Sequence, residues 1–314
     1  MSTAPPGAAA RERARSVGGT PLVHLERLSR EAGVELHAKL EQHNPSGSLK
    51  DRVAEALVDD AEAQGKLAPG GTIVEPTAGN TGPALARVGA LRGYRVILTM
   101  PEATSPERVA LARAYGAEVV RTPGSLMRAA VEQAEVLAAS LPGAVELGQF
   151  SSPANPAAHE RSTGPELWRD LDGRLDVLVA GIGTGGTVTG IGRYLRRQGA
   201  RVRVVGVEPA EAAVLGGGPA GRHRIEGLGA GFVPAVLERE LVDEIVAVTT
   251  ADAFAHARRL ARVEGVLAGP SSGAVLCAAL ALARRPELAG QRFALVLADG
   301  GLKYLSTGLY DDDS

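Results

Sequence analysis

Residues 175–197 read LDVLVAGIGTGGTVTGIGRYLRR, and they carry the clearest fold signal in the chain. Apart from Asp176, the first six residues form an apolar run typical of a buried strand, and residues 186–197 have the spacing of a helix. The glycines between them let successive backbone N–H groups turn toward one anion at the start of the helix. This unit predicts an α/β protein with a phosphate site at the carboxyl end of a strand.

The same alternation of strand and helix patterns extends over most of the chain. Short connections predict parallel sheets covered on both faces by helices. A loop rich in Ser, Pro and Asn, residues 151–155, is the expected domain boundary. The expected strands are 34–40, 72–75, 95–100, 118–121, 175–180, 203–207, 245–248 and 293–298. The expected helices are 51–64, 80–92, 106–115, 126–140, 156–171, 186–197, 251–264 and 271–284.

The composition is that of a globular enzyme. Of the 314 residues, 45% are hydrophobic and 22% are charged, with a formal net charge of −2 and a pI near 6.3. We therefore expect neither a nucleic-acid partner nor an anionic membrane surface. No charge-free apolar stretch of transmembrane length and no secretory leader occur, so a cytoplasmic protein is the default expectation. The single cysteine, Cys277, excludes an intrachain disulfide and a multi-cysteine metal site, and we expect no metal.

The glycine-rich turn by itself leaves two kinds of ligand open. It contains no lysine, so it differs from the phosphate loop of nucleotide triphosphatases. Gly181, Gly183 and Gly186 also satisfy the G-x-G-x-x-G pattern, and Glu208 follows at the end of the next expected strand. A dinucleotide whose ribose contacts Glu208 is therefore an alternative to a cofactor with a single phosphate.

Lys50 is the candidate nucleophile. It follows the turn Asn44-Pro45-Ser46-Gly47-Ser48-Leu49 and opens the expected helix 51–64. An amine among small residues, at a turn that leads into a helix, is well placed to form a Schiff base with a planar cofactor. A solvated surface lysine at a capped helix start is the alternative.

Two further motifs also lie at the starts of expected helices. Glu75-Pro76-Thr77-Ala78-Gly79-Asn80-Thr81-Gly82 surrounds a helix N-terminus whose N–H groups could hold a carboxylate. Gly269-Pro270-Ser271-Ser272-Gly273 opens the last long helix. Asn80 and the serines could alternatively be ordinary helix caps.

Together these four motifs resemble the cysteine synthase (O-acetylserine sulfhydrylase) family, within the fold-type II pyridoxal-phosphate enzymes. The resemblance extends from Gly19-Thr20-Pro21-Leu22 to the segment 303–307, and includes the segments 149–156, 163–168 and 226–234. It implies a tryptophan synthase β-like α/β architecture, with two doubly wound parallel or mixed-sheet domains and the cofactor in the cleft between them. The implied domains are a flexible N-terminus (1–18), a smaller mobile domain (46–152) and a larger domain (19–45 plus 153–314).

The resemblance implies pyridoxal 5'-phosphate as the cofactor and assigns roles to individual residues. Lys50 would form the Schiff base and move the substrate's α-proton, and Asn80 would contact the cofactor's phenolic oxygen. Ser271 would face the pyridine nitrogen. The cofactor phosphate would be held by Gly183, Thr184, Gly185, Gly186 and Thr187. The amino-acid substrate would be bound by Thr77, Ala78, Gly79, Thr81, Gln149 and Gly227.

The implied reaction is a β-replacement, in which O-acetylserine loses acetate and sulfide then adds to give cysteine. Three positions depart from the usual pattern. Ala78 stands where many members have serine, and Pro83 stands where a branched apolar residue is usual. The segment 299–303 resembles the B-type or the phosphoserine-using branch of the family, which leaves the leaving group open.

The alternatives are a cystathionine β-synthase-type condensation with homocysteine, an enzyme that makes another β-substituted alanine, and, more distantly, an NAD-linked oxidoreductase. The family further suggests a homodimer and docking of a serine acetyltransferase.

Overall fold

The computed structural model describes residues 17–124 and 127–311, which form two compact units. The smaller unit contains residues 17–18 and 44–154, and the larger unit contains residues 19–43 and 155–311. The larger unit is therefore built from two separate stretches of chain. Of the predicted N-terminal segment 1–18, all but two residues lie outside the described part.

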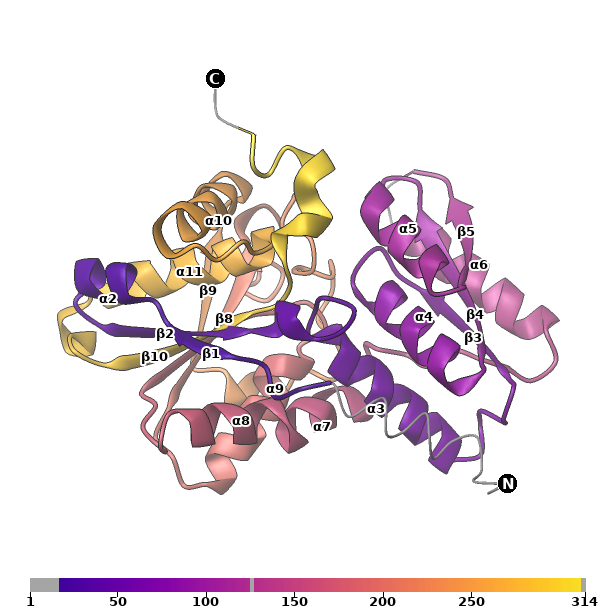
Figure 1. The fold of residues 1–314 in the computed structure, drawn as a ribbon, viewed down its shortest axis with the longest axis horizontal. Coiled ribbons are helices and arrows are strands. Elements are labelled where there is room, and N and C mark those ends of the chain that lie inside the picture. Colours follow the sequence, from indigo (N-terminus) through magenta and orange to yellow (C-terminus); the bar gives the residue numbers. More distant parts are fainter. Residues whose placement is uncertain (1–16, 125–126, 312–314) are drawn as a thin grey trace, which may run out of the picture. The chain divides into compact units, whose positions relative to one another are not determined.

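The larger unit contains a six-stranded sheet in the order β1-β2-β10-β7-β8-β9. All neighbouring strands are parallel except β1 and β2. The strands are β1 (Leu22–His24), β2 (Glu35–Leu40), β7 (Val177–Gly181), β8 (Arg203–Pro209), β9 (Glu244–Val248) and β10 (Arg292–Leu297). The helices are α2 (Glu26–Ala32), α7 (Ala154–Arg161, beginning at the unit boundary), α8 (Thr163–Asp170), α9 (Gly186–Arg197), α10 (Thr250–Glu264) and α11 (Pro270–Ala283). Figure 1 shows α10 and α11 on one face of this sheet and α8 and α9 on the other.

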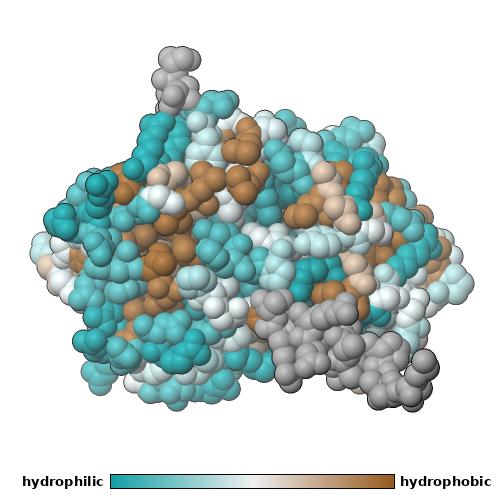
Figure 2. Space-filling view, viewed as in Figure 1, coloured by the Kyte–Doolittle hydropathy of each residue, from teal (hydrophilic) through white to brown (hydrophobic). Residues whose placement is uncertain are grey.

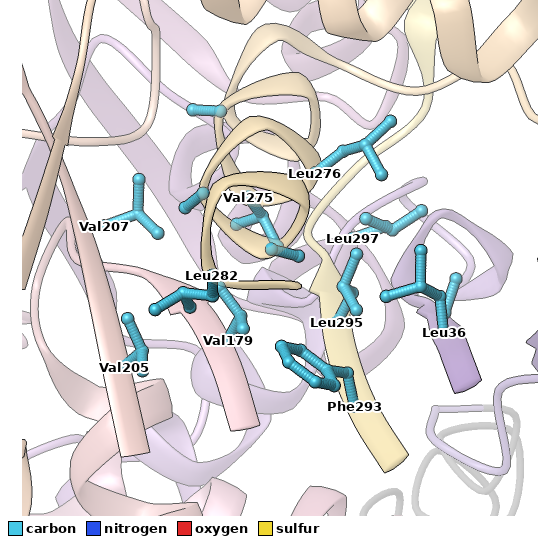
Figure 3. Packing of buried hydrophobic residues seen from close by; sticks show 14 of the residues in the cluster. Leu36, Val179, Val205, Val207, Val275, Leu276, Leu282, Phe293, Leu295 and Leu297 are labelled. Carbon is cyan, nitrogen blue, oxygen red and sulfur yellow. The ribbon is translucent and has the colours of Figure 1, made fainter. Parts of the chain in front are cut away.

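The core of the larger unit lies where α11 packs on the sheet. This helix is apolar on nearly all sides, and 11 of its 14 residues are buried, as expected for a helix enclosed by other elements. Figure 3 shows its residues Val275, Leu276 and Leu282 above the strand residues Val179 and Leu295. Because aromatic residues make up only 3% of the chain, aliphatic side chains supply most of this core.

The smaller unit contains a parallel four-stranded sheet in the order β5-β4-β3-β6. Helix α6 packs against β3 and β4, and α3 packs against α4. The strands are β3 (Thr72–Pro76), β4 (Arg95–Pro101), β5 (Glu118–Thr122) and β6 (Ala144–Val145). The helices are α3 (Lys50–Ala63), α4 (Thr81–Arg92), α5 (Pro106–Ala114) and α6 (Met127–Ser140). Short 3-10 turns, all in the larger unit, are η1 (Glu41–His43), η2 (Ala210–Ala212), η3 (Arg239–Leu241), η4 (Pro286–Leu288) and η5 (Gly301–Thr307).

The expected single helix 156–171 is wrong, because the structure has two helices, α7 and α8, that meet at Ser162. Pro165 explains the break. It lacks the N–H that would bond the carbonyl of Arg161, and its ring would clash with that carbonyl in a continuous helix. The backbone at Ser162 accordingly leaves the helical region, with φ −128° and ψ −69°.

Three short elements were not expected from the sequence: β1, α2 and β6. Strand β6 has two residues and β1 has three, too few for an alternating pattern to stand out. None of the helices within residues 17–124 and 127–311 is long and apolar enough to cross a membrane. On the face drawn in Figure 2, hydrophilic residues surround smaller groups of hydrophobic ones.

Candidate active site

Lys50 is the first residue of α3, where a network of hydrogen bonds holds the preceding turn. Gly47 has a positive φ of 80° and its N–H bonds the carbonyl of Asn44 at 2.7 Å. The buried carboxylate of Asp51 accepts hydrogen bonds from both the backbone N–H and the hydroxyl of Ser46, each at 2.8 Å. The geometry of the turn is therefore fixed immediately before and after Lys50.

The positively charged Arg87 of α4 links this turn to the neighbouring helix. Its Nη1 atom lies 3.6 Å from Oδ1 of Asp51 and 3.2 Å from Oε1 of Glu55. The Lys50 side chain as a whole is partly exposed, but desolvation of its amine lowers its pKa to about 8. About a tenth of the amine is therefore unprotonated at pH 7, far more than for an ordinary lysine, and the unprotonated form is the nucleophile.

The asparagine loop, residues 75–82, joins β3 to α4 in the same unit. Thr77 donates its N–H to the carbonyl of Thr99 at 3.0 Å, and its hydroxyl accepts the N–H of Gly79 at 3.0 Å. Ala78, Gly79 and Asn80 are partly exposed. Asn80 precedes the first residue of α4, but its side chain makes no capping hydrogen bond, so the plain helix-cap interpretation is wrong.

The structure brings Gln149 to the end of this loop. The hydroxyl of Thr81 donates to Oε1 of Gln149 at 2.6 Å, and both side chains are buried. Strands β3 and β6 are adjacent and parallel, so the loops that follow them emerge at the same edge of the sheet. Pro83 is buried in the first turn of α4, where the missing N–H costs little.

The glycine turn, residues 181–187, begins at the last residue of β7 and includes the first two residues of α9 in the larger unit. Gly185 occupies the N-cap position with φ 87° and has no side chain to cap α9, while the hydroxyl of Thr184 accepts the N–H of Gly186 at 3.5 Å. A Cβ at Gly183 would lie 2.2 Å from the carbonyl oxygen of Gly227, and one at Gly186 would lie 2.0 Å from Oδ1 of Asn155. Glycine is therefore required at these positions by the close approach of neighbouring groups.

Both threonine hydroxyls of the turn are held by residues to which the sequence analysis gave no role. Nδ2 of Asn155 donates to Oγ1 of Thr184 at 2.9 Å. The buried ring of His159 lies between two hydroxyls, with Nε2 3.3 Å from Oγ1 of Thr187 and Nδ1 2.9 Å from Oγ1 of Thr163. One indication of each was present in the sequence: Asn155 lies within the matching segment 149–156, and His159 lies between that segment and the matching segment 163–168.

Gly227 and Ser271 also lie in the larger unit. Gly227 has φ 92° and lies against Gly183, while the N–H of Gly229 bonds the carbonyl of Ile182 at 3.1 Å. The loop 227–229 therefore backs the glycine turn.

Ser271 is a buried residue of the first turn of α11. The N-cap of α11 is Gly269, without a side-chain cap, so the interpretation of Ser271 as an ordinary cap is wrong. The N–H of Gly269 bonds the carbonyl of Asp299, and Asp299 accepts a 2.5 Å bond from the hydroxyl of Tyr304. Asp299 follows β10, the neighbour of β7, so Ser271 and the glycine turn are both placed at the carboxyl edge of one sheet.

The dinucleotide interpretation fails at Glu208. Its buried carboxylate accepts the backbone N–H groups of Leu215 and Gly216, both at 2.9 Å. The Glu208 carboxylate therefore bonds a loop of its own unit. A carboxylate that binds a ribose would instead need its oxygens to face the ligand.

Comparison with known proteins assigns the chain to a family. Residues 14–299 match the model of the family described as "Pyridoxal-phosphate dependent enzyme". The chain belongs to this pyridoxal-phosphate dependent enzyme family. Its cofactor is therefore pyridoxal phosphate, and an NAD-linked oxidoreductase is excluded.

Relatives of this pyridoxal-phosphate enzyme place it among the cysteine synthases. Cysteine synthase 3 of Caenorhabditis elegans is 47% identical over 299 residues, which are 95% of this chain and 89% of the relative. A cysteine synthase structure from Entamoeba histolytica has a TM-score of 0.92 at 40% identity, covering 96% of this chain and 90% of that one. A structure of O-ureido-L-serine synthase has a TM-score of 0.90 at 43% identity, covering 96% and 95%. The predicted fold-type II α/β architecture is confirmed.

The residues of the glycine turn fit the phosphate of this cofactor. The turn offers backbone N–H groups and two hydroxyls, and it contains no carboxylate that would repel an anion. The N-cap residue Gly185 has no side chain, and the N–H of Gly186 makes only a long hydrogen bond of 3.5 Å to Oγ1 of Thr184. The partly unprotonated amine of Lys50 fits the aldehyde of the cofactor in the same way.

Proposed function

We propose that this enzyme converts O-acetylserine and sulfide into L-cysteine and acetate. The Cβ–O bond of O-acetylserine breaks and its electron pair leaves with acetate. A Cβ–S bond then forms from sulfide, and the α-proton that was removed in the first half returns in the second. The bound cofactor supplies the electron withdrawal that makes the α-proton acidic.

The observation that carries this proposal is the amine of Lys50 at the start of α3, with a pKa of about 8. An amine with that pKa can act as a nucleophile toward the cofactor and as a base toward the α-proton. The fixed turn beside Asp51 supports the same role, because it limits the directions in which the amine can point.

The remaining roles follow from the contacts within each unit. We assign the cofactor phosphate to the glycine turn with Thr184 and Thr187, and the pyridine nitrogen to Ser271. A serine hydroxyl, unlike a carboxylate, does not hold that nitrogen protonated, and this favours loss of a β-leaving group over transamination. Asn80 is assigned to the cofactor's phenolic oxygen.

The substrate's carboxylate is assigned to the asparagine loop with Gln149. The hydrogen bond from Thr81 to Oε1 of Gln149 fixes the orientation of this amide beside the loop. Thr77 and Gly79 complete the loop, and Gly227 is assigned to the substrate from the larger unit.

A second activity is favoured by one comparison and one residue. The similar O-ureido-L-serine synthase has a product with a different β-substituent, and Ala78 removes a hydroxyl from the asparagine loop. A different leaving group or nucleophile is therefore the main competing function.

The test is a side-by-side assay of the purified holoenzyme with O-acetylserine, O-phosphoserine and serine. Each donor is paired with sulfide, homocysteine and hydroxyurea, and the amino-acid products are identified by mass spectrometry. Cysteine from O-acetylserine and sulfide, at a kcat/KM at least tenfold above every other pair, is expected. A preference for homocysteine would identify a cystathionine β-synthase-type enzyme, and a preference for hydroxyurea an O-ureidoserine-forming one.

Three further properties belong to the same proposal. We propose that the enzyme is a homodimer, that it works in the cytoplasm, and that a serine acetyltransferase is its partner. Light scattering of the purified protein tests the dimer, and its co-elution with a serine acetyltransferase tests the partner.

A further inference from the structure

Glu75 is a buried carboxylate to which the proposed mechanism gives no role. It lies near the end of β3 with an exposed fraction of 1%, directly before the asparagine loop. Burial raises its pKa to about 7, and the nearby charge of Glu146 adds to this effect. A carboxylate in such surroundings is costly to bury unless its oxygens accept hydrogen bonds.

The oxygens of Glu75 are bonded to the backbone of the turn that carries Gln149. The N–H of Leu147 donates to Oε2 at 3.1 Å, and the N–H of Gln149 donates to Oε1 at 3.5 Å. The N–H of Gly148 contributes as well. Above its pKa of about 7 the Glu75 carboxyl group is mostly ionised and only accepts hydrogen bonds, so it matches a turn that presents several donors.

The ladder between β3 and β6 cannot hold this turn. Its paired residues are Thr72 with Ala144 and Ile73 with Val145, after which β6 ends. Beyond Val145, the contact between the two segments passes to the Glu75 side chain. Positive φ at Gly148 (67°), together with the bonds from the N–H groups of Ser151 and Ser152 to the Gly148 carbonyl, then closes the turn.

The asparagine loop is therefore tied to the 147–149 turn at both of its ends. Glu75 at the start of the loop bonds the backbone of the turn, and Thr81 at the end bonds the Gln149 side chain at 2.6 Å. Both Thr81 and Gln149 are buried, so the position of the Gln149 amide depends on where the turn is held.

We infer that Glu75 is a positioning residue whose carboxylate holds the 147–149 turn, so that the Gln149 amide stays aligned with Thr81 in the subsite for the substrate's carboxylate. This inference rests on the proposed function, which assigns that subsite to the asparagine loop and Gln149. Glu75 acts through the turn and does not itself touch the substrate.

The test is Glu75→Gln in the holoenzyme, because glutamine keeps the size of the side chain but replaces one acceptor by an N–H₂ donor. That donor would face a backbone N–H of the turn, and one hydrogen bond would be lost. We expect the KM for O-acetylserine to rise about tenfold, with a smaller change in kcat and unchanged cofactor content.

The matched control is Glu132→Gln, which makes the same charge change at an exposed side chain of α6 in the same unit. It should leave KM within twofold of the wild type. An unchanged KM in folded Glu75→Gln would overturn the inference. If that variant does not fold, Glu75→Asp, which keeps the charge but draws the oxygens back by one methylene, gives the same comparison.

Gln149→Leu separates this inference from the function on which it rests. If Gln149→Leu leaves the KM for O-acetylserine unchanged, the assignment of the subsite is wrong. If Gln149→Leu raises KM but Glu75→Gln does not, the subsite stands and only the role of Glu75 is wrong.

Discussion

The two units hold their candidate site residues by different physical means. In the smaller unit, buried carboxylates accept backbone N–H groups, with Asp51 holding the turn before Lys50 and Glu75 holding the turn of Gln149. In the larger unit, the glycine turn is fixed by the close approach of Gly227 and Asn155, which leave no room for a side chain. The candidate site residues of the smaller unit are therefore held by hydrogen bonds to charged groups, and the glycine turn of the larger unit is held by close steric packing.

The largest expected effect tests the chemistry that the smaller unit positions. Lys50→Ala should lower kcat by more than about 10³, because it removes both the nucleophile and the base. The mass of the borohydride-reduced protein should rise by one cofactor in the wild type and not in the variant. Lys66→Ala, at an exposed lysine of the same unit, is the control. Retained mass gain and activity would show that another amine does this work.

The next effect tests the dependence on shape. Gly183→Ala should weaken cofactor retention by about 10- to 100-fold, because its Cβ would lie 2.2 Å from a backbone oxygen that cannot yield without moving the 227–229 loop. Equilibrium dialysis against pyridoxal phosphate measures this. Gly192→Ala is the control within α9, since its nearest neighbour lies at 3.3 Å on a side chain. Equal retention in both variants would contradict the shape argument.

A pH series tests the electrostatic side of the comparison. The unprotonated fraction of Lys50 should rise about tenfold per pH unit up to its pKa of about 8 and then level off. The rate at which the apoenzyme takes up pyridoxal phosphate, followed by stopped-flow absorbance, should have the same profile. Free Nα-acetyl-lysine under the same conditions should continue to rise toward pH 10. If the protein also rises to pH 10, desolvation does not tune this amine.

The smallest effect concerns the turn before Lys50. Asp51→Asn should lower the free energy of unfolding of the smaller unit by about 1–2 kcal/mol, because a neutral amide oxygen accepts the two Ser46 bonds less strongly than Oδ2 of the carboxylate and the amide N–H₂ would face Arg87. Urea unfolding measures the change. Asp59→Asn, at an exposed position of the same helix, should cost less than half as much. Equal losses would mean that the turn is held by its backbone alone.

Most of the fold and the residues of the motifs could be predicted from the sequence, because both are local patterns. The strand–turn–helix unit at 175–197 and the helix beginning near Lys50 needed no knowledge of distant contacts. The break at Ser162 was also within reach, since Pro165 forbids a continuous helix.

The residues that hold the site could not be found in the same way. Glu75 meets a turn more than 70 positions later in the chain, and Asn155 meets a threonine 29 positions away. Neither of these two contacts has a recognisable spacing in the sequence, because each depends on which loops the fold brings together at one edge of a sheet. The acidic residue Glu208 shows the converse, since it satisfies a dinucleotide pattern but holds a loop of its own unit.

The order of strands in the larger unit has a consequence for biosynthesis. Strand β2 pairs on one edge with β1, but its other edge pairs with β10 and stays open until residue 292 and those after it have left the ribosome. The smaller unit is nearly continuous in sequence, from residue 44 to residue 154, and its whole sheet is available much earlier. The nascent chain can therefore complete the domain that carries Lys50 while one edge of β2 is still unpaired. Chaperones are expected to act at this exposed edge of β2.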